Sequence, residues 1–197
     1  MNTDIILSGV GGQGILSIAT VIGAAALREN LYIKQAEVHG MSQRGGDVQS
    51  SLRISSEPIA SDLIPLGKAD LIISLEPMEA MRYLPYLKKE GWVITNTVPF
   101  VNIPNYPDLD ELHRSIEALG RHVSLDVAKI AGEAASPRAA NIVLLGAASP
   151  FLGIATEKIE EGIRSVFAAK GEAVVEMNLK AFRAGLAVAD AHINNKD

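Results

Sequence analysis

The residues best suited to chemistry are concentrated in two glycine-rich segments, which a strand and a helix would separate. The first segment follows an apolar run and precedes a helical pattern, and it contains Gly9, Gly11, Gly12, Gln13 and Gly14. Such a turn exposes backbone N–H groups at the positive end of a helix, where phosphates and other anions bind. The alternative is a tight turn that needs glycine for a positive φ and binds nothing.

The second segment combines hydrogen-bonding side chains with glycines, and it contains Ser42, Gln43, Arg44, Gly45 and Gly46. The guanidinium of Arg44 presents a planar fork of donors that fits a phosphate or a carboxylate. The two glycines would let the backbone approach a ligand closely. A flexible surface loop or an oligomer contact is the alternative. Together, the two segments predict a binding surface at one edge of a sheet.

An acidic residue follows the first segment at a distance typical of dinucleotide-binding folds. Gly9, Gly11 and Gly14 fit the pattern G-x-G-x-x-G, and Glu37 lies 23 residues beyond Gly14. In such folds an acidic residue at this distance binds the ribose. A stand-alone NAD(P)- or FAD-binding oxidoreductase of the Rossmann type is therefore a second hypothesis. A third is a homodimeric scaffold whose glycine loops bind only protein.

No residue of this chain is assigned a catalytic or metal-binding role. The sequence has no cysteine, which excludes disulfides, thiolate metal sites and cysteine-ligated iron–sulfur clusters within it. The four histidines form no zinc-binding motif, and the nucleophile pattern G-x-S-x-G is missing. Any redox chemistry must therefore use a bound organic cofactor or a partner polypeptide.

The composition indicates an ordered globular protein. The 197 residues suit one domain spanning 1–197, with 48% hydrophobic and 21% charged residues. A formal net charge of −5 gives no support for nucleic-acid binding. The sequence contains no apolar run of the roughly 18 residues that a membrane helix needs, and it begins without a basic signal-peptide region. We therefore expect a cytoplasmic protein that binds neither membrane nor nucleic acid.

The elements that must position the two glycine segments follow from the apolar pattern. Continuous apolar runs are typical of parallel strands buried on both faces, and they occur at 5–7, 71–73 and 92–94. A helix is expected over 15–28 and a strand over 32–38, and the last third of the chain reads as helices. The sequence predicts a Rossmann-like, doubly wound α/β fold with a mostly parallel sheet and C-terminal helices.

Two further segments have mixed signals. Residues 47–54 alternate between apolar and polar side chains, which predicts a strand at the sheet edge or facing a site. On its polar face, Arg53 is expected either to contact the site or to form a salt bridge. Residues 79–89 have helical spacing, although Pro85 must kink or end that helix.

Two polar residues near predicted element ends also need an explanation. Glu76 precedes Pro77 and is expected to cap the following helix, although paired with Glu37 it could do acid–base work. Asn141 is expected to be an N-cap or to begin a helix, with a ligand contact of its amide as the alternative.

The two glycine segments, taken together, resemble a known family. Residues 8–15, residues 37–46 and Arg53 resemble the gamma domain of 2-oxoacid:ferredoxin oxidoreductases. Within that family, the chain is most similar to the small beta subunits of indolepyruvate ferredoxin oxidoreductases. The similarity covers most of the chain, including residues 70–76, 96–97 and 141–146.

The resemblance implies a subunit that is inactive alone. The family oxidatively decarboxylates a 2-oxoacid, here an arylpyruvate such as indolepyruvate, to an acyl-CoA and reduces ferredoxin. Thiamine diphosphate and the iron–sulfur clusters would lie in a large catalytic partner subunit, and the isolated chain could form a homodimer. Residues 9–14 and 42–46 would line a surface near the shared active site or the CoA path. Contact with CoA, with thiamine diphosphate or only with the partner is left open.

Overall fold

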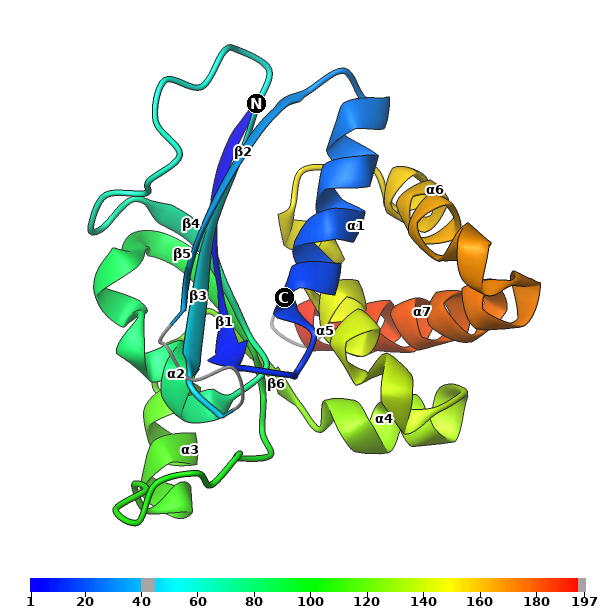
Figure 1. The fold of residues 1–197 in the computed structure, drawn as a ribbon. Helices are drawn as coiled ribbons and strands as arrows, with labels where there is room; N and C mark the ends of the chain where they lie inside the picture. The colour runs from blue at the N-terminus through cyan, green and yellow to red at the C-terminus, as the bar shows by residue number, and fades with distance from the viewer. Residues whose placement is uncertain (40–44, 195–197) are drawn as a thin grey trace.

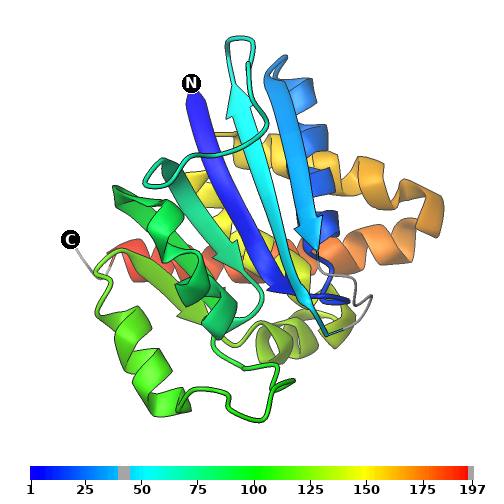
Figure 2. The same ribbon diagram turned by 60° about the vertical axis from the view of Figure 1, so that its left-hand side comes forward.

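The computed structural model describes residues 1–39 and 45–194, and it places one sheet between two layers of helices (Figure 1). The six strands lie in the order β2-β3-β1-β4-β5-β6. All neighbouring strands pair in parallel except β3, which is antiparallel to both β1 and β2 (Figure 2). The strands are β1 (Asn2–Val10), β2 (Tyr32–His39), β3 (Asp47–Ser55), β4 (Ala69–Ser74), β5 (Leu87–Asn96) and β6 (His122–Leu125).

Helices cover both faces of the sheet. Helices α2 and α3 lie on one face, and α1, α5, α6 and α7 lie on the other (Figure 1). Within the described ranges, none of the helices is long and apolar enough to cross a membrane. The helices are α1 (Ile15–Arg28), α2 (Pro77–Arg82), α3 (Leu109–Glu117), α4 (Val127–Ala134), α5 (Ala140–Ala148), α6 (Thr156–Phe167) and α7 (Glu172–Asn194).

The central strands are apolar on both faces because helices cover each of them. Along β1, Ile5 and Leu7 belong to the larger hydrophobic core, which the C-terminal helices complete. Ile6 points the other way, into the smaller core beneath α2. All three side chains are fully buried, which is the pattern of a parallel strand between two helical layers. The predicted doubly wound fold with C-terminal helices is confirmed.

The C-terminal helices pack closely because glycines lie where they touch. Helix α5 is apolar around its whole circumference, as expected of a buried helix. Gly146 on α5 lies against the backbone of Phe182, and Gly185 on α7 lies against the backbone of Val143. A side chain at either position would separate the two helices. This contact therefore fixes the helical layer that supports β1, β4 and β5.

The helix predicted over 79–89 does not reach residue 89; of the two outcomes expected at Pro85, a kink or an end, the helix ends. Helix α2 ends at Arg82, and Pro85 lies in a short 3-10 turn, Leu84–Tyr86. Proline lacks the backbone N–H that a continuing helix would need, so the chain turns there. Leu87 then begins β5 by pairing with Ala69 of β4. The apolar residues of 79–89 keep helical spacing although the chain passes from α2 to β5, so their spacing alone does not indicate where the helix ends.

Strand β3 is internal, so of the two alternatives for residues 47–54, the strand at the sheet edge is wrong. On its polar face, Arg53 forms an ion pair with the neighbouring strand β1. The Nε and Nη2 atoms of Arg53 donate to the Oδ1 and Oδ2 atoms of Asp4 at 2.8 and 3.0 Å. The Asp4 side chain is 6% exposed and that of Arg53 is 19% exposed. Of the two interpretations of Arg53, the salt bridge is the one that the structure contains.

The close contact between α5 and α7 yields a stability prediction. In Gly185→Ala, the new Cβ would lie 2.8 Å from the carbonyl carbon of Val143 and 3.0 Å from the nitrogen of Ala147. We expect the free energy of unfolding to fall by about 1–3 kcal/mol or more, because backbone cannot move away as a side chain can. Urea denaturation followed by circular dichroism measures this change.

A matched substitution in another helix controls for the added methyl group. In Gly132→Ala on α4, the new Cβ would meet Pro137 at an ordinary 3.6 Å. Alanine favours a helix over glycine by about 1 kcal/mol, so this variant should be as stable as the wild type or more stable. Equal stability of Gly185→Ala and the wild type would contradict the close packing.

Candidate functional site

The candidate site lies where the connections of the sheet change sides. Strands β1 and β4 are parallel neighbours, yet β1 leads to α1 on one face and β4 leads to α2 on the other. In open α/β sheets, ligands bind outside the carboxyl ends of the strands at this position. We call the carboxyl ends of β1 and β4, with the loops that follow them, the switch point.

The first glycine loop connects β1 to α1 at the switch point. Gly12 and Gly14 have φ values of +100° and +88°, which favour glycine, and Gly12 is exposed. Gly14 is the N-cap of α1, and no side chain caps this end. The N–H of Ser17 donates to the carbonyl of Gly14 at 3.1 Å. The N–H groups of Ile15 and Leu16 precede it and could bind an anion, whose charge the helix dipole would stabilise.

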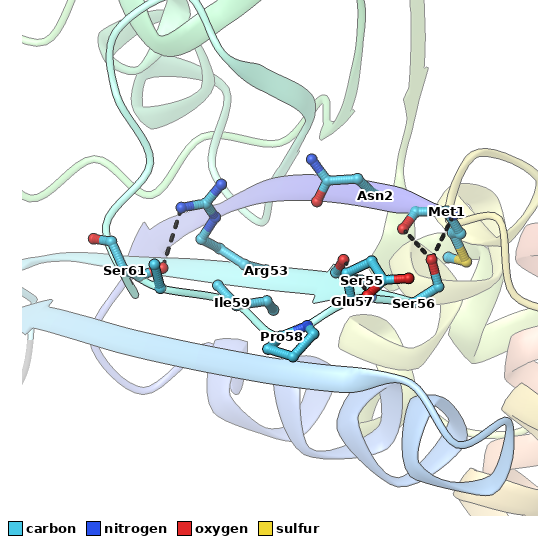
Figure 3. A pocket seen from close by; sticks show the side chains of 10 residues that line it. Met1, Asn2, Arg53, Ser55, Ser56, Glu57, Pro58, Ile59 and Ser61 are labelled. Atoms are coloured by element: carbon cyan, nitrogen blue, oxygen red, sulfur yellow. Dashed lines mark hydrogen bonds between the residues drawn. The ribbon is translucent and has the colours of Figure 1, made fainter.

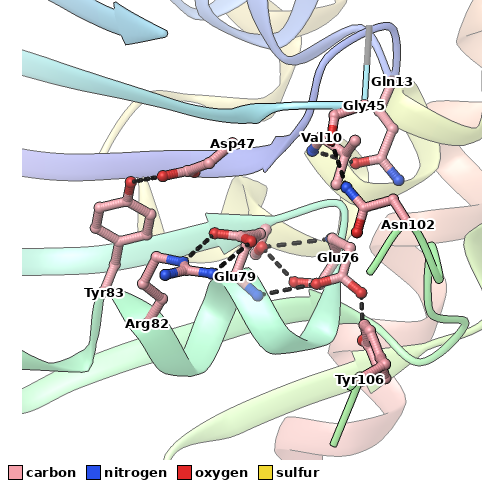
Figure 4. Close-up of polar contacts among 11 residues, drawn as sticks. Val10, Gln13, Gly45, Asp47, Glu76, Glu79, Arg82, Tyr83, Asn102 and Tyr106 are labelled. Atoms are coloured by element: carbon pink, nitrogen blue, oxygen red, sulfur yellow. Dashed lines mark hydrogen bonds and ion pairs between the residues drawn. The ribbon is translucent and has the colours of Figure 1, made fainter. Parts of the chain in front are cut away.

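Gln13 holds the loop in shape. Its Oε1 accepts a hydrogen bond from the backbone N–H of Val10 at 2.8 Å, and its Nε2 donates to the carbonyl of Leu75 at 3.2 Å. Its backbone N–H also donates to the carbonyl of Val10 at 3.1 Å. Gln13 thus ties the end of β1 to the end of β4. Both ends of its side-chain amide contact the protein itself, and Figure 4 shows the contact with Val10.

Asn141 supports the other side of the same loop. Its Nδ2 donates to the carbonyl of Gly14 at 3.1 Å, and a Cβ on Gly14 would lie 2.8 Å from that nitrogen. Asn141 lies in the first turn of α5, after the N-cap residue Ala139. A helix does start here as expected, one residue before Asn141, whereas the N-cap alternative is wrong. The amide of Asn141 contacts the loop between β1 and α1.

The structure brings Gly45 and Gly46, the described part of the second glycine segment, to the first segment. The N–H of Gly11 donates to the carbonyl of Gly46 at 2.9 Å. The carbonyl of Gly45 accepts a hydrogen bond from Nδ2 of Asn102, which lies in the loop after β5 (Figure 4). The predicted residues Ser42, Gln43 and Arg44 lie outside the described residues.

The sheet does not bring Glu37 to the glycine loop. Glu37 is exposed on the edge strand β2, opposite Ser50 of β3, which in turn lies opposite Leu7 of β1. Two strand spacings of about 4.8 Å place β2 about 10 Å from β1. In a dinucleotide-binding fold, the strand with the acidic residue lies directly beside the glycine-loop strand. The insertion of β3 removes the geometry on which the ribose-binding interpretation depends.

A buried carboxylate, Glu76, organises the carboxyl end of β4. Glu76 is fully buried, and its Oε2 accepts from the N–H of Glu79 at 2.9 Å, which confirms the expected helix cap. Its Oε1 accepts from the N–H of Phe100 at 3.2 Å and from the hydroxyl of Tyr106. Glu76 therefore fixes both the start of α2 and the loop that follows β5 (Figure 4).

A second acidic cluster, which sequence reasoning missed, joins α2 to the start of β3. Glu79 is 3% exposed, and its Oε2 accepts from Nε of Arg82 at 2.7 Å. Asp47, the first residue of β3, accepts a hydrogen bond from the hydroxyl of Tyr83 at 2.8 Å. The spacing of Glu79 and Arg82 suits a helical ion pair, but the contact with β3 spans 36 residues and leaves no local signal.

Burial raises the pKa of Glu79 to about 7, and the nearby charge of Asp47 adds to this effect. The hydrogen bond and the positive charge of Arg82 act in the opposite direction and lower that pKa. Burial and the hydrogen bond to Asp47 likewise raise the pKa of the Tyr83 hydroxyl, which therefore remains a donor at neutral pH.

The switch point is suited to binding an anion rather than to covalent chemistry. An uncapped helix N-terminus beside exposed glycine backbone fits a phosphate or a carboxylate. Among the residues that the structure describes, no cluster of three or more histidine, cysteine, aspartate or glutamate side chains could hold a metal ion. An iron–sulfur cluster does not fit, because the sequence has no cysteine to ligate it.

A pocket lies at the opposite end of β1 and, apart from Arg53, is lined by none of the residues predicted for the site (Figure 3). It has a volume of about 560 Å³ and extends from Met1 and Asn2 to the segment 55–61. Its polar groups contact one another: the amino terminus donates to Oγ of Ser56 at 3.0 Å, and Nη1 of Arg53 donates to the carbonyl of Ser61 at 3.1 Å. These contacts hold the β3–β4 connection against the sheet.

The raised pKa of Glu79 predicts a pH dependence of stability. The folded chain binds this proton more tightly than the unfolded chain, whose glutamate has a pKa of 4.5. Stability contributed by protonated Glu79 is therefore lost as the pH rises from about 4.5 to about 7, and it changes little above that range. Urea denaturation across this range should show the free energy of unfolding of the wild type falling relative to that of Glu79→Gln.

An exposed glutamate provides the control for this comparison. The variant Glu161→Gln on α6, where the side chain is 47% exposed, is measured in parallel to account for the loss of one surface carboxylate. A wild-type curve that runs parallel to that of Glu79→Gln would contradict the raised pKa.

Three similar proteins belong to one class of enzyme. The chain is 40% identical to the indolepyruvate oxidoreductase subunit IorB of Thermococcus kodakarensis, over 94% of this chain and 95% of that protein. A 2-oxoglutarate:ferredoxin oxidoreductase from Magnetococcus marinus, solved with 2-oxoglutarate, coenzyme A and succinyl-CoA bound, is similar in structure with a TM-score of 0.75 and 25% identity. That match covers 96% of this chain and 31% of the other.

The gamma subunit of a keto/oxoacid ferredoxin oxidoreductase from Geobacter sulfurreducens is similar over its whole length. It has a TM-score of 0.69 and 25% identity, over 97% of this chain and 98% of that subunit. The family model described as pyruvate ferredoxin/flavodoxin oxidoreductase matches residues 4–188. With its fold, its paired glycine loops and this match over nearly the whole chain, the protein belongs to the pyruvate ferredoxin/flavodoxin oxidoreductase family.

Proposed function

We propose that this chain, a single domain over residues 1–197, is the small subunit of a cytoplasmic arylpyruvate:ferredoxin oxidoreductase. Indolepyruvate is the proposed substrate, and the reaction is its CoA-dependent oxidative decarboxylation to an acyl-CoA, with electrons passing to ferredoxin. The observation that carries this proposal is the 40% identity to an indolepyruvate oxidoreductase subunit along almost the full length of both chains.

The chemistry is divided between this chain and a larger catalytic subunit. Without cysteine, this chain cannot ligate the iron–sulfur clusters, so these would lie in the partner. The same partner would hold thiamine diphosphate, which supplies the stabilised carbanion for decarboxylation when bound. Ferredoxin would then dock on the complex through that partner. Consistent with this division, the Magnetococcus enzyme carries the equivalent domain as 31% of a longer chain.

The contribution of this chain would be binding and orientation at a shared site. Gly9, Gly11, Gly12 and Gly14 shape the loop at the uncapped end of α1, and Gln13 holds it there. Gly45 and Gly46 extend the same surface, and Ser42, Gln43 and Arg44 would add polar contacts. An anionic group of CoA is the proposed ligand, with thiamine diphosphate or the partner subunit itself as the alternatives. Glu37, on the edge strand, would contribute only through the partner.

The test is a viologen-linked assay with indolepyruvate, CoA and thiamine diphosphate. It is run on this chain alone and on the chain co-expressed with its larger partner subunit. We expect activity only in the co-expressed sample. Activity in neither sample, together with tight binding of a nicotinamide or a flavin by the isolated chain, would contradict the proposal.

Within this assay, Arg44→Ala tests the second glycine segment. We expect acyl-CoA formation to fall by about tenfold or more, because a charge-assisted contact to an anion would be lost. The midpoint of thermal unfolding should stay close to that of the wild type. Arg164→Ala on α6 is the control, since its half-exposed ion pairs contribute little. Full activity of Arg44→Ala would count against an anion contact by this residue.

A further inference from the structure

We propose that residues 98–103, in the loop after β5, form the surface on which the larger catalytic subunit docks. This inference rests on the proposed function and names where the partner binds. We call this stretch the β5 loop surface. It follows the carboxyl end of β5, and because β5 runs parallel to β1 and β4, it lies at the same end of the strands as the switch point.

The β5 loop surface exposes apolar side chains that a free surface would rarely carry together. Val98 is 42% exposed, Phe100 45%, Val101 65% and Ile103 37%. From Thr97 to Pro107 the sequence contains no charged residue. A compact apolar group without charges, at the surface of a chain with 21% charged residues, is typical of the buried centre of a protein interface.

The loop is held in place before any partner binds. Nδ2 of Asn96 donates to the carbonyl of Val98 at 2.9 Å, and the N–H of Phe100 donates to the buried Glu76 at 3.2 Å. Tyr106 donates to the same carboxylate. Binding through a loop of fixed shape loses little conformational entropy, so its apolar area contributes more fully to affinity.

The loop also contacts the functional site directly. Nδ2 of Asn102, in the middle of the β5 loop surface, donates to the carbonyl of Gly45 in the second glycine segment. Gly46 is in turn bonded to Gly11 of the first segment. A subunit that covers residues 98–103 would therefore lie directly against both glycine loops, which is the position that a shared site requires.

The larger subunit, rather than a second copy of this chain, is the occupant that the observations favour. In the Magnetococcus enzyme, the match to this chain covers 31% of a longer chain, so a larger polypeptide is covalently joined to the equivalent domain there. The connection between β3 and β4, at the opposite end of the parallel strands, also exposes leucines: Leu63 is 60% exposed and Leu66 is 66% exposed. However, Glu57, Asp62 and Lys68 surround those leucines in the sequence, so that connection is less suited to a dry interface.

The test compares two aspartate substitutions of equal exposure. Val101→Asp places a charge on the β5 loop surface, and Leu66→Asp places one in the β3–β4 connection at the opposite end of the strands. Val101 is 65% exposed and Leu66 is 66% exposed. The affinity of each full-length variant for the purified larger subunit is measured by calorimetry. We expect Val101→Asp to bind at least about tenfold more weakly, because the charge would be buried without a partner. Leu66→Asp should bind like the wild type.

Thermal unfolding of each isolated variant shows whether it is folded. Because Val101 and Leu66 are mostly exposed, the unfolding midpoints of both variants should agree with that of the wild type. Wild-type affinity of Val101→Asp would overturn the proposal, as would weakened binding by Leu66→Asp alone. Loss of a homodimer in Val101→Asp, with unchanged affinity for the larger subunit, would also overturn it. A wild-type complex that forms but does not oxidise indolepyruvate would instead contradict the proposed function and leave the docking surface intact.

Discussion

The candidate site depends on the position of strand β3, which lies between β1 and β2 and is antiparallel to both. Strand β3 lies between β2 and β1, so the chain returns from the second glycine segment directly beside the end of β1, with Asp47 opposite Val10. The hydrogen bond from Gly11 to Gly46 follows from this register. If β2 paired with β1 directly, as in a dinucleotide-binding sheet, Glu37 would approach the first loop. Because β3 lies between β1 and β2, Glu37 stays away from the first loop, and the second glycine segment lies beside it instead.

Two buried carboxylates hold the parts of this site in place. Glu76 joins the end of β4 to the β5 loop surface, and Glu79 lies in the cluster that joins α2 to β3. Burying a charged group is costly unless hydrogen bonds or an opposite charge compensate. Here Glu76 receives three hydrogen bonds, and Glu79 has Arg82 as its partner. Through these contacts, Glu76 and the cluster around Glu79 hold the loop after β5, the start of α2 and the start of β3 close to one another.

The sequence predicted the parts of the fold that local pattern controls. The buried strands, helix α1 and the glycine turn depend on residues that are neighbours in the chain, and they occur where expected. The position of β3 did not follow, because alternating polarity identifies a strand without identifying its partners. The ion pair of Arg53 with Asp4 and the contact of Tyr83 with Asp47 join residues 49 and 36 positions apart. Only the folded sheet makes those contacts, so the salt bridge of Arg53 was one of two alternatives without a named partner, and the contact of Tyr83 with Asp47 was not predicted.

The central claim is that the two glycine segments line a site completed by the larger subunit. Hydrogen–deuterium exchange of this chain, alone and in the complex with and without CoA, tests it most directly. The account predicts slower exchange at residues 9–15 and 45–47 in the complex, slower still with CoA, and unchanged exchange at residues 56–61. Protection limited to residues 56–61, with unchanged exchange at both glycine segments, would contradict it.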